Sequence, residues 1–322
     1  ELSGNIDLFL TLKNLQLCNS NVEHIFSLNE IDEQQLDLAL RFIALTDLPM
    51  MTCLFVGPKN SFSLKNLTGL TIMRCDKLKI AFSTSILRFL PQLLYLTIEE
   101  CKELEHIIED DLENQNNSTT CFPKLEDLAV RNCNKLKFVF SSTSMLRFLP
   151  QLYSLRIEDC KELEHIIEDD LENKNNSTTC FPKLELNSLR IEECKELEHI
   201  IEDDLENKNN STTCFPKLEH VTVRKCNKLK FVFSSSMLRV LPMLLYLTIE
   251  ECKELEHIIE DDLENKNNST TCFPKLKKDC KELEHIIEDD LENKNNSTTC
   301  FPKLQALLII KCNKLKFVFP FS

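Results

Sequence analysis

The sequence is almost free of glycine, with only Gly4, Gly57 and Gly69 among its 322 residues. It therefore contains no GxxxxGK[ST] or GxGxxG run, and a glycine-rich loop that cradles phosphate groups is excluded within this chain. No stretch reaches about 18 uninterrupted apolar residues, so the sequence predicts no membrane span. Neither a nucleotide cofactor nor a transmembrane helix is therefore expected from these residues.

The cysteines are numerous but lack the spacing of a metal site. There are 16 of them and no CxxC pair, whereas a zinc site needs two such pairs or a histidine at close spacing. We interpret them as small buried side chains with a weak S–H donor, placed at one turn of a repeated unit. So many thiols without an evident pairing scheme favour a reducing compartment. The nine that share this turn are Cys75, Cys101, Cys133, Cys160, Cys194, Cys226, Cys252, Cys280 and Cys312.

What the sequence does have is internal repetition. The block CKELEHIIEDDLENKNNSTTCFPKL occurs four times without change, starting at Cys160, Cys194, Cys252 and Cys280, and a fifth copy at Cys101 differs only by Gln115. Five near-identical blocks cannot form five different parts of one globular core. They predict an architecture in which one unit is stacked on itself.

A strand-like segment, LxxLxI or LxxLxV, precedes each block and serves as the ruler of the repeat. Counted this way the chain holds about eleven units at steps of 26 to 34 residues, one of them degenerate at 273–280 because Lys277 falls in an apolar position. The last apolar residues of the ten regular segments are Leu17, Leu45, Ile72, Ile98, Val130, Ile157, Ile191, Val223, Ile249 and Ile309.

The unit predicts an α/β solenoid of the leucine-rich-repeat type. Alternating apolar residues place two side chains on one face of a short strand, which can bury that face only by pairing with its neighbours in a parallel sheet. We expect a single domain over 1–322, a horseshoe with the sheet on its concave face and loops or short helices on its convex face. The predicted core is Leu96, Ile98, Leu104, Ile107, Phe122, Leu125, Leu128, Val130, Leu136 and Phe140.

One position breaks the pattern. Burying the ammonium group of Lys277 without a partner costs several kcal/mol, so we expect an irregular sheet near 273–279.

Charge is concentrated in the repeated blocks. The net charge is −14, and each exact block carries six acids and three lysines, while units with Lys135, Lys137, Lys228 and Lys230 lie between them. Such an anionic chain is a poor candidate for binding nucleic acid. The repeated histidine of LEHII, beside acids, is compatible with a metal or pH-sensing ladder, but we interpret it as a solvated turn copied by duplication. No metal, cofactor or catalytic residue is assigned.

The segments FPKLEHVTVRKCNKLKFVFSS and LPQLLYLTIEECKELEHIIED resemble the C-terminal leucine-rich repeats of plant intracellular immune receptors, the coiled-coil nucleotide-binding class. The resemblance covers almost the whole chain. It implies a cytoplasmic, non-enzymatic module that recognises a pathogen effector or a guarded host protein and restrains the receptor's own nucleotide-binding domain. That domain has no counterpart here, so we expect the chain to be a fragment of a longer protein.

Two alternatives stay open from the residues alone. F-box leucine-rich repeats, the substrate receptors of ubiquitin ligases, also place a cysteine after the strand at about 26 residues, although the run that follows differs from CKELEHII and CNKLKFVF. A repeat fragment without activity is the other alternative.

If the module binds a protein, the partner surface is expected on the exposed positions of the strands. Tyrosine and arginine are the usual anchors of protein interfaces. The candidate partner-binding residues are Tyr95, Thr97, Arg131, Tyr153, Arg156, Arg224 and Tyr246.

Overall fold

The described part of the chain is a stack of short strands in register. The computed structural model describes residues 11–27, 36–56, 62–83, 90–109, 122–140, 149–167, 184–201, 215, 217–233, 241–259, 301 and 303–315. All the regular elements in these residues are strands. The serine-rich stretches 141–148 and 234–240, where we expect short helices of the convex face, lie outside the described residues.

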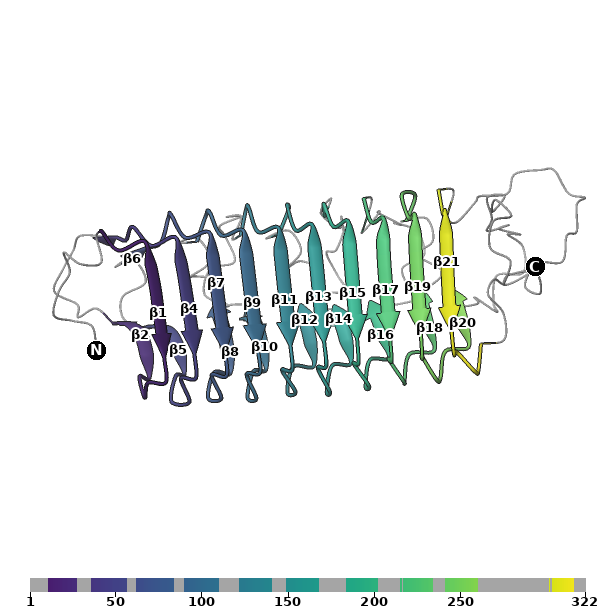
Figure 1. Cartoon of the computed structure of the whole chain (residues 1–322), viewed down its shortest axis with the longest axis horizontal. Helices are drawn as coiled ribbons and strands as arrows, with labels where there is room; N and C mark the ends of the chain where they lie inside the picture. The colour runs from purple at the N-terminus through teal and green to yellow at the C-terminus, as the bar shows by residue number, and fades with distance from the viewer. Residues whose placement is uncertain are drawn as a thin grey trace, which may run out of the picture.

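Ten strands form one parallel sheet that runs the length of the molecule, and they lie side by side from β1 at one end to β21 at the other (Figure 1). Each has five residues, of which the second and fourth point into the core. The strands are β1 (Asn14–Cys18), β4 (Phe42–Thr46), β7 (Gly69–Met73), β9 (Tyr95–Glu99), β11 (Asp127–Arg131), β13 (Ser154–Glu158), β15 (Ser188–Glu192), β17 (His220–Arg224), β19 (Tyr246–Glu250) and β21 (Ala306–Ile310).

The register of this sheet confirms the spacing that the sequence predicts. All ten ruler residues fall in the fourth position of a strand, and each pairs with the next across the sheet, from Leu17 opposite Leu45 to Ile249 opposite Ile309. β19 pairs directly with β21. The irregularity predicted at 273–279 lies outside the described residues.

A second layer of shorter parallel strands lies behind the long sheet (Figure 1). Its pairs and triplets are β2 (His24–Ser27) with β5 (Cys53–Val56), β3 (Leu36–Asp37) with β6 (Phe62–Ser63), β8 (Ile80–Ser83) with β10 (His106–Glu109), β12 (Phe138–Phe140) with β14 (His165–Ile167) and β16 (His199–Ile201), and β18 (Phe231–Phe233) with β20 (His257–Ile259).

This layer corrects the interpretation of the LEHII histidines. His106, His165, His199 and His257 do not lie in a solvated turn, because each is the first residue of a short strand. The rings of His165 and His199 stack at 5.8 Å with an angle of 1° between their planes. The histidines therefore contribute to the packing of the second layer, where they also meet phenylalanine rings such as Phe138.

The core fills the space between the two layers as one continuous cluster of buried side chains. All ten predicted core residues are buried, with at most 2% of any of them exposed. The buried leucine of FPKL closes a tight turn, as Leu125 does by donating its backbone N–H to the carbonyl of Phe122 at 3.3 Å. Each unit thus contributes side chains from its strand, from the turn before it and from the short strand after it.

The cysteine that follows each strand is confirmed as a buried side chain. Seven of the nine, Cys75 through Cys252, have no exposed surface, Cys312 is partly buried, and Cys280 lies outside the described residues. The thiol donates to the carbonyl two residues earlier, for example from Cys133 Sγ to Arg131 O at 3.4 Å. The side chain is small enough to turn the chain into the core while satisfying a carbonyl at the strand end.

The residue that directly follows each long strand has the left-handed backbone conformation. Ten such residues have φ between 49° and 59°, and none is glycine. In nine of them the N–H donates to the carbonyl that ends the neighbouring strand, as from Asn132 to Glu158 at 2.9 Å. The turn therefore continues the hydrogen-bond ladder one residue beyond the sheet.

Asn132 offers a direct test of this turn. Asn132→Val is expected to lower the free energy of unfolding by about 1–2 kcal/mol, because a β-branched side chain is strained at positive φ. Asn132→Gly is expected to stay within about 0.5 kcal/mol of the parent, since glycine accepts this φ but adds freedom to the unfolded chain. Urea unfolding of both variants checks the prediction. Equal losses would show that the asparagine side chain, and not the backbone, is what matters.

Exposed ion pairs join neighbouring units at the turn side of the sheet. Lys135 pairs with Glu103 at 2.6 Å and Lys228 with Glu196 at 2.5 Å, so basic units do lie against acidic ones. Pairs this exposed contribute only about 0–1 kcal/mol each.

Candidate recognition surface

The candidate site is the outer face of the long sheet, formed by the first, third and fifth residues of each strand. Tyr95 and Tyr246 occupy the first position and are 48% and 40% exposed. Thr97 and Arg156 occupy the third position, and Arg131 and Arg224 the fifth. Six of the seven candidate residues therefore lie on the predicted face.

The seventh, Tyr153, is displaced from that face. It comes one residue before β13, so the strand begins at Ser154, which takes the position that Tyr95 holds in β9. Tyr153 is 53% exposed and borders an open hollow at the rim of the sheet. The hollow is lined by Glu126, Pro150, Gln151, Tyr153 and Glu185.

Arg131 and Arg224 are held between acids of the adjoining strands. The Arg131 guanidinium contacts Glu99 on one side and Glu158 on the other, where Nε lies 3.0 Å from Oε2. All three side chains are at most 31% exposed. The arginine is therefore fixed in place and largely neutralised before any partner arrives.

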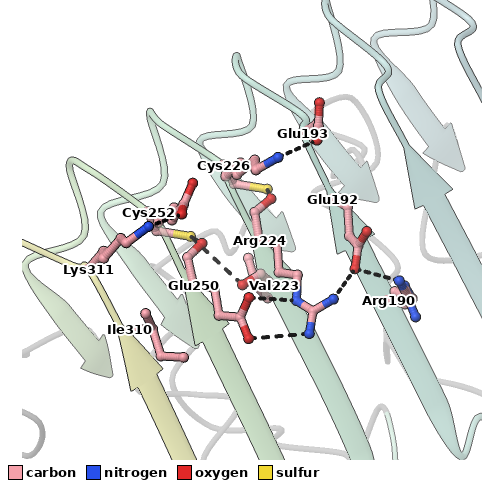
Figure 2. A network of polar contacts seen from close by, with 12 residues as sticks. Arg190, Glu192, Glu193, Val223, Arg224, Cys226, Glu250, Cys252, Ile310 and Lys311 are labelled. Atoms are coloured by element: carbon pink, nitrogen blue, oxygen red, sulfur yellow. Dashed lines mark hydrogen bonds and ion pairs between the residues drawn. The ribbon is translucent and has the colours of Figure 1, made fainter.

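The same arrangement recurs around Arg224 (Figure 2). Its Nη1 lies 3.2 Å from Glu192 Oε1, and its Nε lies 3.0 Å from Glu250 Oε2. Arg190 continues the row by contacting Glu192 at 2.8 Å and Glu158 at 3.8 Å. A ladder of alternating charge thus crosses the sheet from Glu99 on β9 to Glu250 on β19.

Arg156 is less fully matched than the other arginines. Its Nη2 contacts Asp127 Oδ1 at 3.1 Å, whereas each of the other three arginines described above contacts two carboxylates. It stands directly opposite Arg190 in the register, and like charges in facing positions are destabilising. These two arginines, each more than 40% exposed, form the most available positive charge in the middle of the face.

Aromatic side chains lie toward both ends of the described sheet. The Tyr246 ring stacks on His220 at 4.9 Å with 7° between the planes, and its hydroxyl donates to Gln305 at 3.1 Å. At the other end Phe42 is 52% exposed and its ring covers Gly69. A Cβ on Gly69 would lie 2.7 Å from Phe42 Cδ1, so glycine is what lets the ring rest on the strand.

Several exposed side chains of this face were missed by reasoning from the central units. Phe42 occupies the first position of β4, and Leu308 and Ile310 the third and fifth positions of β21; they are 52%, 46% and 38% exposed. Aligning all units on the last apolar residue of each strand segment, which is Leu45 or Ile309 in these units, identifies them.

Metal binding and membrane insertion find no support among the residues that the structure describes. No group of three or more His, Cys, Asp or Glu side chains in this part of the chain is arranged to hold a metal ion. No helix within it is long and apolar enough to span a bilayer.

Comparison with known proteins identifies the family. The profile described as "Plant disease resistance protein RPS2-like, leucine-rich repeats" matches residues 3–102, 102–253 and 206–322. The chain belongs to this family. It is thus a leucine-rich-repeat region of a plant disease resistance protein, a repeat region that binds proteins and carries no catalytic function. This membership decides against the F-box alternative.

Individual proteins match this RPS2-like repeat region at low sequence identity or over a small part of their length. The chain is 33% identical over 101 residues to the "Probable disease resistance protein At1g61300" of Arabidopsis thaliana, a match that covers 31% of this chain and 12% of that protein. Among solved structures, the "Plant peptide hormone receptor RGFR1 in complex with RGF2" is 15% identical, with 73% of this chain and 46% of that chain covered. Its TM-score is 0.20, and we assign the fold from the strands described above and not from this similarity.

Proposed function

We propose that the outer face of the long sheet is the surface on which this disease resistance protein recognises its protein partners in the cytoplasm. The partner is a pathogen effector or a guarded host protein, and, in the complete receptor, its own nucleotide-binding domain. The observation that carries this proposal is the combination of exposed tyrosines with arginines already fixed by neighbouring acids.

The fixed arginines favour recognition because little conformational entropy is lost when they meet a partner. Arg131, for example, is already held by contacts to Glu99 and Glu158 in the chain alone. Tyr95 and Tyr246 add large, amphipathic contact areas that become buried on binding. Tyr153 and Thr97 extend the same surface, the first at its rim.

The experiment uses the receptor that contains this chain. The complete transcript is sequenced, and the nucleotide-binding domain that it is expected to encode is expressed together with the repeat chain. Binding of the two is then measured by titration. Tyr246→Ala and Tyr95→Ala are expected to weaken binding by roughly 30-fold each, which corresponds to about 2 kcal/mol for a central interface tyrosine.

The control is a substitution on the opposite side of the repeat. Lys137→Ala removes an exposed side chain whose ion pair to Glu164 spans 3.7 Å, and it is expected to leave binding unchanged. Equal effects of Lys137→Ala and Tyr246→Ala would place the interface elsewhere. A transcript that encodes no such domain would leave effector or host-protein recognition as the remaining form of the proposal.

A further inference from the structure

The thiols of the repeat form a column that runs through the stack, one per unit. Because the strands pair in register, the cysteine after each strand lies beside the cysteine of the neighbouring unit. All members of the column from Cys75 to Cys252 are fully buried, and Cys312, in the last described unit, is only partly buried. The neighbouring pair formed by Cys252 and Cys312 is therefore the one that solvent reaches.

The backbone places these two cysteines within bridging distance. Glu250 pairs with Ile310, and the next residue, Glu251, donates its N–H to Ile310 O at 2.8 Å. Both thiols adopt the same geometry, each donating to the carbonyl two residues earlier at 3.6 Å. Paired strands lie about 4.8 Å apart, which falls inside the roughly 4.4–6.8 Å range of Cα separations in disulfides. At a strand spacing of about 4.8 Å, their parallel Cβ atoms need to approach by about 1 Å to reach the mean Cβ separation of roughly 3.8 Å in disulfides.

The two thiols differ in acidity. A hydrogen bond with Cys252 lowers the pKa of Cys312 to about 7, against the opposing effect of its partial burial. The same hydrogen bond, together with burial, raises the pKa of Cys252, which therefore keeps its proton. Deeper in the stack burial raises the pKa of both Cys160 and Cys194. At neutral pH Cys312 is therefore expected to carry a larger thiolate fraction than Cys160 or Cys194.

We propose that Cys312 and Cys252 form an oxidation site, at which a hydroperoxide converts the two neighbouring thiols into a disulfide that ties β21 to β19. The Cys312 thiolate attacks an oxygen of the hydroperoxide, an S–O bond forms as the O–O bond breaks, and the departing oxygen takes up a proton to leave as alcohol or water. Cys252 then attacks the sulfenic sulfur of Cys312. The S–S bond forms, the S–O bond breaks, and hydroxide leaves with the Cys252 proton as water. Two thiols are oxidised by two electrons and one hydroperoxide is reduced.

The site has a structural consequence of its own. β19 and β21 are neighbours in the sheet although about 60 residues separate them in sequence, so noncovalent contacts such as the ion pair of Lys311 with Glu251 hold the last described unit against β19. A disulfide would fix that register covalently, and a thiol reductant would release it.

Hydrogen peroxide serves as the probe, applied to the full chain under native conditions. The expected result is a Cys252–Cys312 disulfide in the digest and loss of both thiols, with Cys160 and Cys194 still reduced. Before oxidation, Cys312 is expected to react with iodoacetamide roughly 10-fold faster than Cys160. Trypsin gives the same Cys-Asn-Lys peptide from Cys226 and Cys312, so the assignment requires the variant Cys312→Ser, which must abolish the cross-link.

Two further variants keep the proposal falsifiable. Cys252→Ser is expected to stop the reaction at the sulfenic acid of Cys312, which a dimedone adduct detects without any need for the cross-link. Cys160→Ser, at a buried position of the column, is expected to leave the Cys252–Cys312 cross-link unchanged. A peroxide-treated chain in which Cys312 stays reduced, or pairs mainly with another cysteine, would overturn the proposal.

Discussion

Replacing Ile98 by lysine is expected to lower the free energy of unfolding by about 4 kcal/mol. Ile98 is fully buried at the fourth position of β9, where it lies between Ile72 of β7 and Val130 of β11. The substitution removes buried apolar surface and places an ammonium group in a core whose described residues include no buried acid. Ile98→Lys thus places a lysine at the apolar position of a regular unit, as Lys277 does in the degenerate unit.

The neighbouring residue supplies the matched control. Thr97→Lys introduces the same side chain one position earlier, on the outer face of the same strand, and is expected to change stability by less than about 0.5 kcal/mol. Hydrogen exchange measured by mass spectrometry shows where protection is lost. Because each unit contacts mainly its neighbours, Ile98→Lys is expected to expose β7, β9 and β11 first, while β17 and β19 keep their protection. Uniform loss along the whole sheet would show instead that the stack unfolds as one unit.

Reversing the charge of Arg224 is expected to have the second largest effect. Arg224→Glu places a carboxylate between Glu192 and Glu250, which are 18% and 24% exposed. The loss of two ion pairs and the new repulsion are expected to cost about 2 kcal/mol at low ionic strength. Since partly exposed charges are screened by salt, the loss is expected to shrink as salt is added to the urea-unfolding experiment.

Two comparisons isolate the ladder from the general effect of adding negative charge. Lys225→Glu makes the same change in charge one residue along, but its pair with Glu193 is about half exposed, so the expected loss is under about 1 kcal/mol. The double variant R224E/E250R restores an opposite-charge contact with β19 and is expected to recover part of the stability. If Lys225→Glu and Arg224→Glu cost the same at every salt concentration, the ladder contributes nothing specific. The expected loss of stability also means that charge reversal at Arg131 or Arg224 alone cannot test partner binding, because it weakens the sheet as well.

The positions of the long strands could be predicted from the sequence because two constraints coincide there. An apolar residue at the fourth strand position recurs in every regular unit, and a cysteine follows three residues later in most of them, as with Ile98 and Cys101. Unit lengths vary, yet the variation lies between the strands, so it does not disturb the register. Of the ten predicted core residues, Leu96, Ile98, Leu128 and Val130 follow from this alternation, and the other six lie in the turns and the short strands.

The second layer was missed because its strands are too short to show a period. HII and FVF present two consecutive buried residues after one partly exposed residue, which resembles a turn more than an alternating strand. These segments are strands because they form hydrogen bonds with the neighbouring unit, and the sequence of a single unit does not show that pairing. Tyr153 illustrates a different error. In LLYLTIEEC the tyrosine directly precedes the buried leucine, but in LYSLRIEDC a serine intervenes, so alignment on Ile157 puts Tyr153 outside the strand.

The charge ladder was also within reach of the sequence. Glu99, Arg131 and Glu158 occupy the same slot of successive units, and Glu192, Arg224 and Glu250 repeat the order. Aligning the units and reading down the fifth strand position gives two Glu–Arg–Glu runs directly, with Glu158 facing Glu192 where the runs meet. What the alignment does not give is side-chain direction, such as the reach of Arg190 from the third position of its strand to Glu158 and Glu192.

The residue-for-residue register has a consequence for how such a surface changes length. β13 and β15 pair without offset, and the rings of His165 and His199 stack almost parallel. A duplicated unit therefore packs against the unit it was copied from through contacts between equivalent residues. Each added copy lengthens the outer face by one strand spacing, about 4.8 Å, and leaves every other contact in place. Recombination between identical stretches of the gene would therefore change the length of the outer face in steps of one unit, while the fold of each unit stays the same.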